Sequence, residues 1–241
     1  VQVSIGISTY NGLDGADAMG ALLAGSDIER GAARLGVSTA ALRAVIAVET
    51  AGGGFVDGQL PKILFEGHVL HRLTGGAFDA RRPDLSHPRW TKAHYRGGRG
   101  EYDRLLAAVE LDADAALQAC SWGLAQVMGT NFEICGFTTI DDFVDAMAAS
   151  EGDQLDAMVG FIAHHGLDQP LRRADWASFA RGYNGPDYAA NAYDTKLAEA
   201  YAAAWTDADT GGVPFVEDRA RVAALQRALV ADGAEIAVDG W

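Results

Sequence analysis

The stretch TAALRAVIAVET, residues 39–50, carries the clearest helical pattern from which the fold can be inferred. Leu42, Val45 and Ile46 follow an i, i+3, i+4 spacing, which places them on one face of a helix. Ser38 directly precedes the stretch, and its hydroxyl can accept an early backbone N–H. We therefore predict a helix over residues 39–50 that packs its apolar face into a core.

The next position on this apolar face is Glu49. Burial disfavours the charged form of a carboxyl group, and the last turn of a helix disfavours an anion because that end of the helix dipole is negative. Both effects raise the pKa of the acid. An acid that keeps its proton near neutral pH can donate it to a leaving oxygen, so we predict Glu49 as a general acid. The alternatives are a glutamate paired with an arginine and a helix end that reaches solvent.

Two further acids follow closely in the chain. Residues 55–65 contain the turn signal Asp57-Gly58 between apolar flanks and predict a β-hairpin. A helix is expected from about residue 65 to residue 73, with Glu66 on its apolar face. Because cleavage of a sugar bond usually requires two acids, Glu66 and Asp57 are candidates for the second catalytic carboxylate. The alternatives are that Glu66 braces the hairpin and that Asp57 is only a turn residue.

The remaining chain is mostly helical in pattern. Residues 75–100 form a loop rich in Gly, Pro, Arg and His, and residues 101–205 are predicted to be nearly all helical, with breaks at glycines. Residues 1–24 are weakly patterned and predict an arm, and residues 206–216 are a polar, Gly-rich linker. The fold class is therefore mainly α with one small β-hairpin.

Composition excludes several classes of protein. The chain has 241 residues, of which 49% are hydrophobic, and a formal net charge of −14. Such an acidic surface repels phosphate backbones, so we expect no nucleic-acid partner. No run of about 18 uncharged apolar residues occurs, so we expect no insertion into a membrane. Residues 1–10 lack both a basic residue and a long apolar run, so no signal peptide is visible.

Several motifs, in the expected order, resemble the lysozyme-like superfamily. Val48-Glu49-Thr50 closes a helix before a small hairpin, SWGLAQVM at residues 121–128 resembles Gly-Leu-Met-Gln-(Ile/Val)-Met, and FARGYNGP at residues 179–186 resembles Ala-Tyr-Asn-Ala-Gly. More closely, PKILFEGH at residues 61–68 and the stretch 181–197 look like the N-acetylmuramidase domain of modular phage endolysins.

The resemblance covers roughly residues 26–205. It implies a helical lobe that forms a saccharide groove with the hairpin, and Glu49 as the catalytic acid of a peptidoglycan hydrolase. It implies cleavage of the β-1,4 bond between N-acetylmuramic acid and N-acetylglucosamine, with no metal ion and no cofactor. The chain would act as a monomer on glycan strands. The implied substrate-binding residues are Ser121, Trp122, Gln126, Tyr183 and Asn184.

These residues have a chemical rationale as substrate-binding groups, and some of them also have a simpler structural explanation. The amides of Gln126 and Asn184 suit N-acetyl groups, and the Tyr183 ring suits a sugar face. Trp122 also fits a core position. The chain departs from the family pattern at Thr50, where transglycosylases commonly carry Ser, and at Ala125, which replaces Met. A lytic transglycosylase that gives anhydro-muropeptides is the alternative activity.

The C-terminal residues resemble another module. VAALQRAL at residues 222–229 and VDGW at residues 238–241 resemble the start of a peptidoglycan-binding module, which predicts a partial module over residues 217–241. The alternative is an ordinary amphipathic helix. The expected division is thus an arm, a catalytic domain over residues 25–205, a linker and this module. Action on the bacterial cell wall after phage-type release from the host cytoplasm is expected.

The sequence leaves open two rival functions and whether its two cysteines form a disulfide. Glu66, His68 and His71, with His164-His165, form a weak metal-ligand pattern that would suit a zinc peptidase, although the His-Glu-x-x-His order is missing. A non-catalytic wall-binding protein on the same scaffold is the second rival. Cys120 and Cys135 are the only cysteines, and either a disulfide or two buried thiols would fit them.

Overall fold

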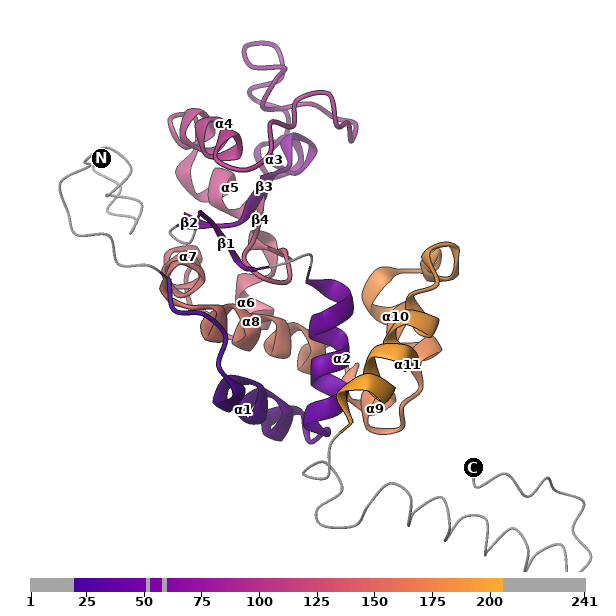
Figure 1. Ribbon diagram of the computed structural model, residues 1–241. Helices are drawn as coiled ribbons and strands as arrows, with labels where there is room; N and C mark the ends of the chain where they lie inside the picture. The colour runs from indigo at the N-terminus through magenta and orange to yellow at the C-terminus, as the bar shows by residue number, and fades with distance from the viewer. Residues whose placement is uncertain (1–19, 51–52, 58–59, 206–241) are drawn as a thin grey trace, which may run out of the picture.

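The computed structural model describes residues 20–50, 53–57 and 60–205. Within them, α-helices surround two small β-sheets, as the predicted fold class requires (Figure 1). The elements before the long loop are α1 (Gly25–Leu35), α2 (Thr39–Glu49), β1 (Phe55–Val56), β2 (Leu60–Pro61), β3 (Ile63–Phe65) and α3 (Gly67–Thr74). Those after it are α4 (Gly100–Val109), α5 (Ala113–Gln118), β4 (Cys120–Trp122), β5 (Val127–Met128), η2 (Gly129–Asn131), α6 (Phe132–Cys135), α7 (Ile140–Ala149), α8 (Glu151–His164), α9 (Asp168–Arg172), α10 (Trp176–Asn184), η3 (Tyr188–Asn191) and α11 (Tyr193–Ala204).

Helix α2 forms as its sequence predicts. The Ser38 side chain accepts a hydrogen bond from the backbone N–H of Ala41, and the helix ends at Glu49. Leu42 and Val45 are completely buried, and Ile46 is half-buried against the core. Helices α1 and α11 pack on α2, which stands beside α10 and α11 in Figure 1. Packing of this apolar face therefore fixes the position of the C-terminal end of α2, and with it the position of Glu49.

The hairpin predicted over residues 55–65 is confirmed over residues 55–61, while residues 63–65 belong to a second sheet. Strands β1 and β2 pair antiparallel, with Phe55 opposite Pro61. Strands β3, β4 and β5 form an antiparallel sheet in that order. The prediction of a nearly all-helical segment is therefore wrong over residues 120–128, where β4 and β5 form a hairpin. The pairing of β4 with β3 spans more than 50 residues, so it depends on distant contacts that no local pattern reports.

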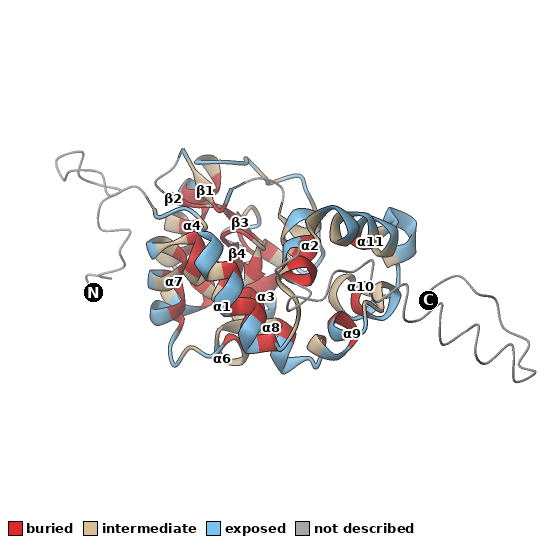
Figure 2. Cartoon of the chain, turned by 60° about the horizontal axis from the view of Figure 1, so that its bottom comes forward, coloured by how far each residue is buried: buried red, intermediate tan, exposed pale blue. Residues whose placement is uncertain are grey.

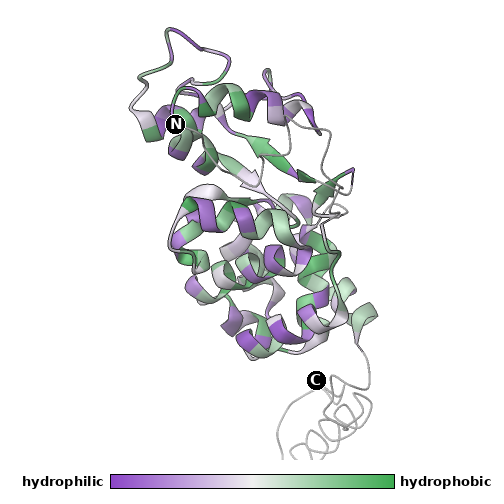
Figure 3. Ribbon diagram, turned by 90° about the vertical axis from the view of Figure 1, so that its left-hand side faces the viewer, coloured by the Kyte–Doolittle hydropathy of each residue, from purple (hydrophilic) through white to green (hydrophobic). Residues whose placement is uncertain are grey.

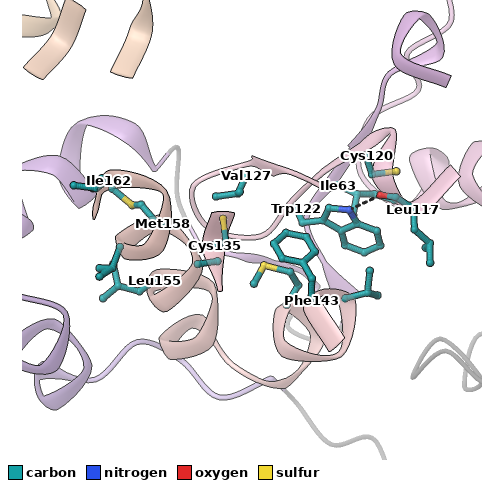
Figure 4. Close-up of a cluster of buried hydrophobic side chains, with 14 of the residues drawn as sticks. Ile63, Leu117, Cys120, Trp122, Val127, Cys135, Phe143, Leu155, Met158 and Ile162 are labelled. Carbon is teal, nitrogen blue, oxygen red and sulfur yellow. Dashed lines mark hydrogen bonds between the residues drawn. The ribbon is translucent and has the colours of Figure 1, made fainter. Parts of the chain in front are cut away.

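The hydrophobic core lies between the β3–β4–β5 sheet and the long helix α8. Buried residues gather around β3, β4 and α8 in Figure 2, while the helices carry separate hydrophilic and hydrophobic stripes in Figure 3. Figure 4 shows Trp122 and Phe143 in this core near the side chain of Cys135. Both cysteines are buried and free. Burial raises the pKa of each thiol, that of Cys135 to about 11, so both stay protonated near neutral pH.

The loop of residues 75–100 is attached to the sheet by a buried glutamate. Glu101 is completely buried, and its carboxylate accepts hydrogen bonds from the backbone N–H groups of Arg96, at 2.6 Å, and Gly97, at 3.0 Å. It also accepts one from the N–H of Phe65 in β3 and one from Arg104. Burial raises the pKa of this carboxyl group, but these donors outweigh that effect and lower it overall. The acid therefore stays ionised and holds loop and sheet together.

The part of the predicted arm that the structure describes contacts the helical lobe. Ala21 forms a parallel bridge with Ser150, and the N–H of Leu23 donates to Glu151 at 2.9 Å. The predicted linker (206–216) and partial module (217–241) lie outside the described residues. Among the described residues no single helix is long and apolar enough to cross a membrane; α1 and α2 together pass that test by length and composition, with a bend of 110°.

Candidate active site

Glu49 lies where the ends of two helices meet. It is the last residue of α2 and is half-buried. Asn184, the last residue of α10, donates from Nδ2 to both carboxylate oxygens at 3.1 Å. Helix α10 stops there because Gly185 adopts a φ of +88°, a conformation that favours glycine. Burial raises the pKa of Glu49, and the Asn184 hydrogen bond offsets part of this rise.

Tyr183 adds an aromatic wall near this acid. Its ring stacks on Phe179 with the centroids 5.4 Å apart and meets the edge of Phe161 at 5.7 Å. Burial and the nearby charge of Glu49 raise the pKa of its hydroxyl, which keeps the phenol neutral. The structure thus brings together three of the predicted site residues, Glu49, Tyr183 and Asn184.

Ser121 and Gln126 meet across the turn that joins β4 and β5. The Ser121 hydroxyl donates to Oε1 of Gln126 at 2.9 Å. The amide nitrogen of Gln126 donates to the carbonyl oxygens of Gly123, at 2.9 Å, and Lys62, at 3.1 Å. Gln126 itself has a φ of +50°. These contacts fix the shape of the turn and attach it to the chain just before β3.

The prediction of Trp122 as a substrate-binding residue is wrong. Trp122 is completely buried, and its indole nitrogen donates to the carbonyl oxygen of Leu117 at 3.0 Å (Figure 4). Successive side chains of a strand point to opposite faces, and this residue faces the core. Its role is to fill the interior beneath the sheet.

Two buried polar side chains that the sequence analysis missed hold the segments around the site. Glu151 accepts the backbone N–H of Gly54 at 2.6 Å, and Gln154 accepts that of Leu124 at 2.7 Å. Both side chains lie in the first turns of α8 and are almost fully buried. They fix the chain that follows Glu49 and the β4–β5 turn. A signal was present, because both positions fall on the same helix face as buried Leu155 and Met158.

The other two predicted acids have different partners from Glu49. Asp57 is exposed at a φ of +54° and accepts a hydrogen bond from Nε of Arg99 at 2.7 Å. Glu66 lies at the N-terminus of α3, and both of its oxygens accept from the Tyr95 hydroxyl, at 2.7 and 2.8 Å. His68 lies 3.2 Å from the same carboxylate. Both acids therefore accept hydrogen bonds from side chains of the 75–100 loop.

The histidines of the zinc hypothesis contact individual partners. Nδ1 of His71 lies 2.7 Å from Asp79, and Nδ1 of His165 lies 3.0 Å from the carbonyl oxygen of Phe161. Across the described ranges, no group of three or more His, Cys, Asp and Glu side chains could hold a metal ion.

Comparison with known proteins assigns the family. The N-acetylmuramidase family matches residues 38–205, which include Glu49, both sheets and Asn184. The crystal structure of the Burkholderia AP3 phage endolysin is similar, with a TM-score of 0.73 and 38% identity, over 82% of this chain and 76% of that one. No curated protein matches the chain. The chain therefore belongs to the N-acetylmuramidase family of peptidoglycan hydrolases.

Proposed function

We propose that the protein cleaves the β-1,4 bond between N-acetylmuramic acid and N-acetylglucosamine, with Glu49 as the general acid. The observation that supports this most is a half-buried carboxyl group whose pKa is raised by burial, held by Asn184 at the end of a helix. A raised pKa increases the protonated fraction of the acid at a given pH, and proton donation to a leaving oxygen requires the protonated form.

Asn184 and Tyr183 would bind the saccharide beside this acid. Oδ1 of Asn184 is buried and has no hydrogen-bond partner among the described residues. Since an unsatisfied buried acceptor costs free energy, a substrate N–H or O–H group would be stabilising there. In this proposal Ser121 and Gln126 shape the β4–β5 turn that borders the substrate, rather than offering free donors.

Proton transfer from Glu49 would leave an oxocarbenium-like state on the muramyl ring. Either Glu66 or Asp57 would then orient a water molecule or stabilise the cation. Of the two, Glu66 lies in the more shielded position, with a side chain 14% exposed against 64% for Asp57. Attack by the muramyl 6-hydroxyl group, which gives an anhydro product, is the transglycosylase alternative.

Product masses test the proposal directly. Digestion of purified sacculi by the wild-type protein is expected to release muropeptides with a reducing N-acetylmuramic acid end. Each should carry one added water, because a hydrolase uses water as the acceptor. Mass spectrometry of the digest is the measurement. Anhydro-muropeptides would instead show the transglycosylase, and wall binding without any release would show a binding protein.

The hydrogen bond from Asn184 gives a prediction on pH. Asn184→Ala is expected to move the alkaline limb of the pH–rate profile to higher pH, because this bond lowers the pKa of Glu49 and its removal lets the pKa rise. The rate at the optimum should fall as well, since the acid loses its orienting partner. Asn191→Ala, in the neighbouring η3 segment, is the matched control and should leave the limb in place. An alkaline limb that moves to lower pH in Asn184→Ala would contradict the assignment.

A further inference from the structure

A pocket of about 200 Å³ lies between the 75–100 loop and α4. None of the steps proposed for the reaction uses it. Its lining mixes three basic side chains with one acid, one phenol and one methyl group. These lining residues are Asp84, Ala93, His94, Tyr95, Arg96 and Arg104.

Arg104, one of the lining residues, carries an unmet hydrogen-bond donor. Its side chain is almost fully buried, and Nη1 donates to Glu101 at 2.7 Å and to the carbonyl oxygen of Phe65 at 2.8 Å. Nη2, in contrast, is buried and has no hydrogen-bond partner within the part of the chain that the structure describes. The guanidinium lies over the rings of Phe65 and Tyr95, with its carbon 5.0 and 5.8 Å from their centroids. Because burying a charged donor without an acceptor is costly, an acceptor that enters the pocket would be favoured.

The charge around the pocket favours an anionic acceptor. Asp84, the one acid in the lining, already binds Arg82 through both of its oxygens, at 3.0 and 2.8 Å. The guanidinium of Arg96 lies at a long distance, 3.7 Å, from the carboxylate of exposed Asp103. In a chain with a net charge of −14, this loop is a local basic surface. A carboxylate suits it best, since guanidinium groups bind carboxylates through charge-assisted hydrogen bonds.

The loop that builds this pocket also contacts the two predicted second acids. Tyr95 lines the pocket and donates to Glu66, and Arg99 donates to Asp57. A ligand that reaches the pocket would therefore lie in the same lobe as these acids. On peptidoglycan, each muramic acid bears a short peptide that ends in free carboxylates. A stem of three to five extended residues reaches roughly 10–17 Å from the sugar.

We propose that this pocket binds a carboxylate of the peptide stem carried by the glycan strand. The proposal rests on the proposed function, because it assigns the pocket to the same substrate. It makes the protein selective for glycan that carries peptide. Arg104 supplies the buried donor, and Arg96 supplies positive charge at the pocket lining.

Steric filling of the pocket tests this selectivity. Ala93→Phe is expected to lower kcat/KM about tenfold on peptide-bearing sacculi, because the ring occupies the space of a charge-assisted hydrogen bond. On sacculi stripped of peptide by an amidase, the variant should match the wild type. Ala80→Phe, an exposed position in the same loop outside the lining, is the matched control and should leave both rates unchanged.

Two variants that each remove one positive charge, and a binding measurement, distinguish binding in the pocket from general electrostatic attraction. Arg96→Gln should weaken cleavage of peptide-bearing sacculi more than Arg89→Gln, since only Arg96 lines the pocket. Calorimetric titration with a stem tetrapeptide should show binding, and the same peptide with amidated carboxylates should not bind. Equal losses in both charge variants, or equal effects of Ala93→Phe on both substrates, would overturn the proposal. A wild type that binds the tetrapeptide but cleaves neither substrate would contradict the proposed function alone.

Discussion

Glu49→Gln is expected to lower the rate of wall lysis by about 100- to 10,000-fold, the contribution typical of a general acid. Glutamine keeps the size of the side chain and one of the two oxygens that accept from Asn184, but it has no acidic proton to donate to the leaving oxygen. Dye release from labelled sacculi measures the rate. The melting temperature should stay close to that of the wild type, because the substitution replaces a carboxyl group that burial already disfavours in its charged form.

Glu29→Gln is the matched control for this variant. Glu29 is exposed on α1, so the same chemical change there should leave both lysis and melting temperature unchanged. Binding of Glu49→Gln to sacculi should persist, which separates loss of chemistry from loss of substrate. If Glu49→Gln lyses sacculi at a rate near that of the wild type, Glu49 is not the acid and the proposed mechanism is wrong.

Local patterns predicted the elements that set Glu49 in place. Helix α2 follows from a three-residue apolar stripe and from the Ser38 cap, both of which depend only on nearby residues. The β1–β2 hairpin follows from the Asp57-Gly58 turn signal in the same way. Because this apolar stripe continues to position 49, it also implies a carboxyl group shielded from solvent, and Glu49 is indeed partly buried, with a pKa that burial raises.

Residues whose role depends on distant contacts were not predictable in this way. Strand β4 pairs with β3 across more than 50 residues, and its short pattern resembles the helices on either side. The partner of Glu49 is Asn184, 135 positions away, and only the resemblance to a family brought the two into one site. Glu151 and Gln154 bind Gly54 and Leu124, which lie 97 and 30 positions away, so the helix face that marks both side chains as buried could not name these partners.

Glu101 is a second residue whose carboxylate is expected to have a large effect, in this case on the stability of the fold. It is completely buried and receives hydrogen bonds from two loop N–H groups, from one N–H of β3 and from Arg104. Because its pKa is lowered in the folded protein, its ionisation stabilises the fold above the pKa of the unfolded chain. That contribution is lost as pH falls through the lowered value. Glu49, with a raised pKa, has the opposite dependence, and its contribution is lost as pH rises.

Glu101→Ala is expected to lower the free energy of unfolding by about 3–5 kcal/mol, because removal of one partner leaves the buried charge of Arg104 uncompensated. Chemical denaturation measures this loss. The loop should also detach, so trypsin should cut it at the basic residues between positions 89 and 99 while α8 and α2 stay protected. Glu110→Ala, an exposed acid at the end of the same helix, should change stability by less than about 0.5 kcal/mol. An unfolding free energy of Glu101→Ala equal to that of Glu110→Ala would show that the loop is held by other contacts.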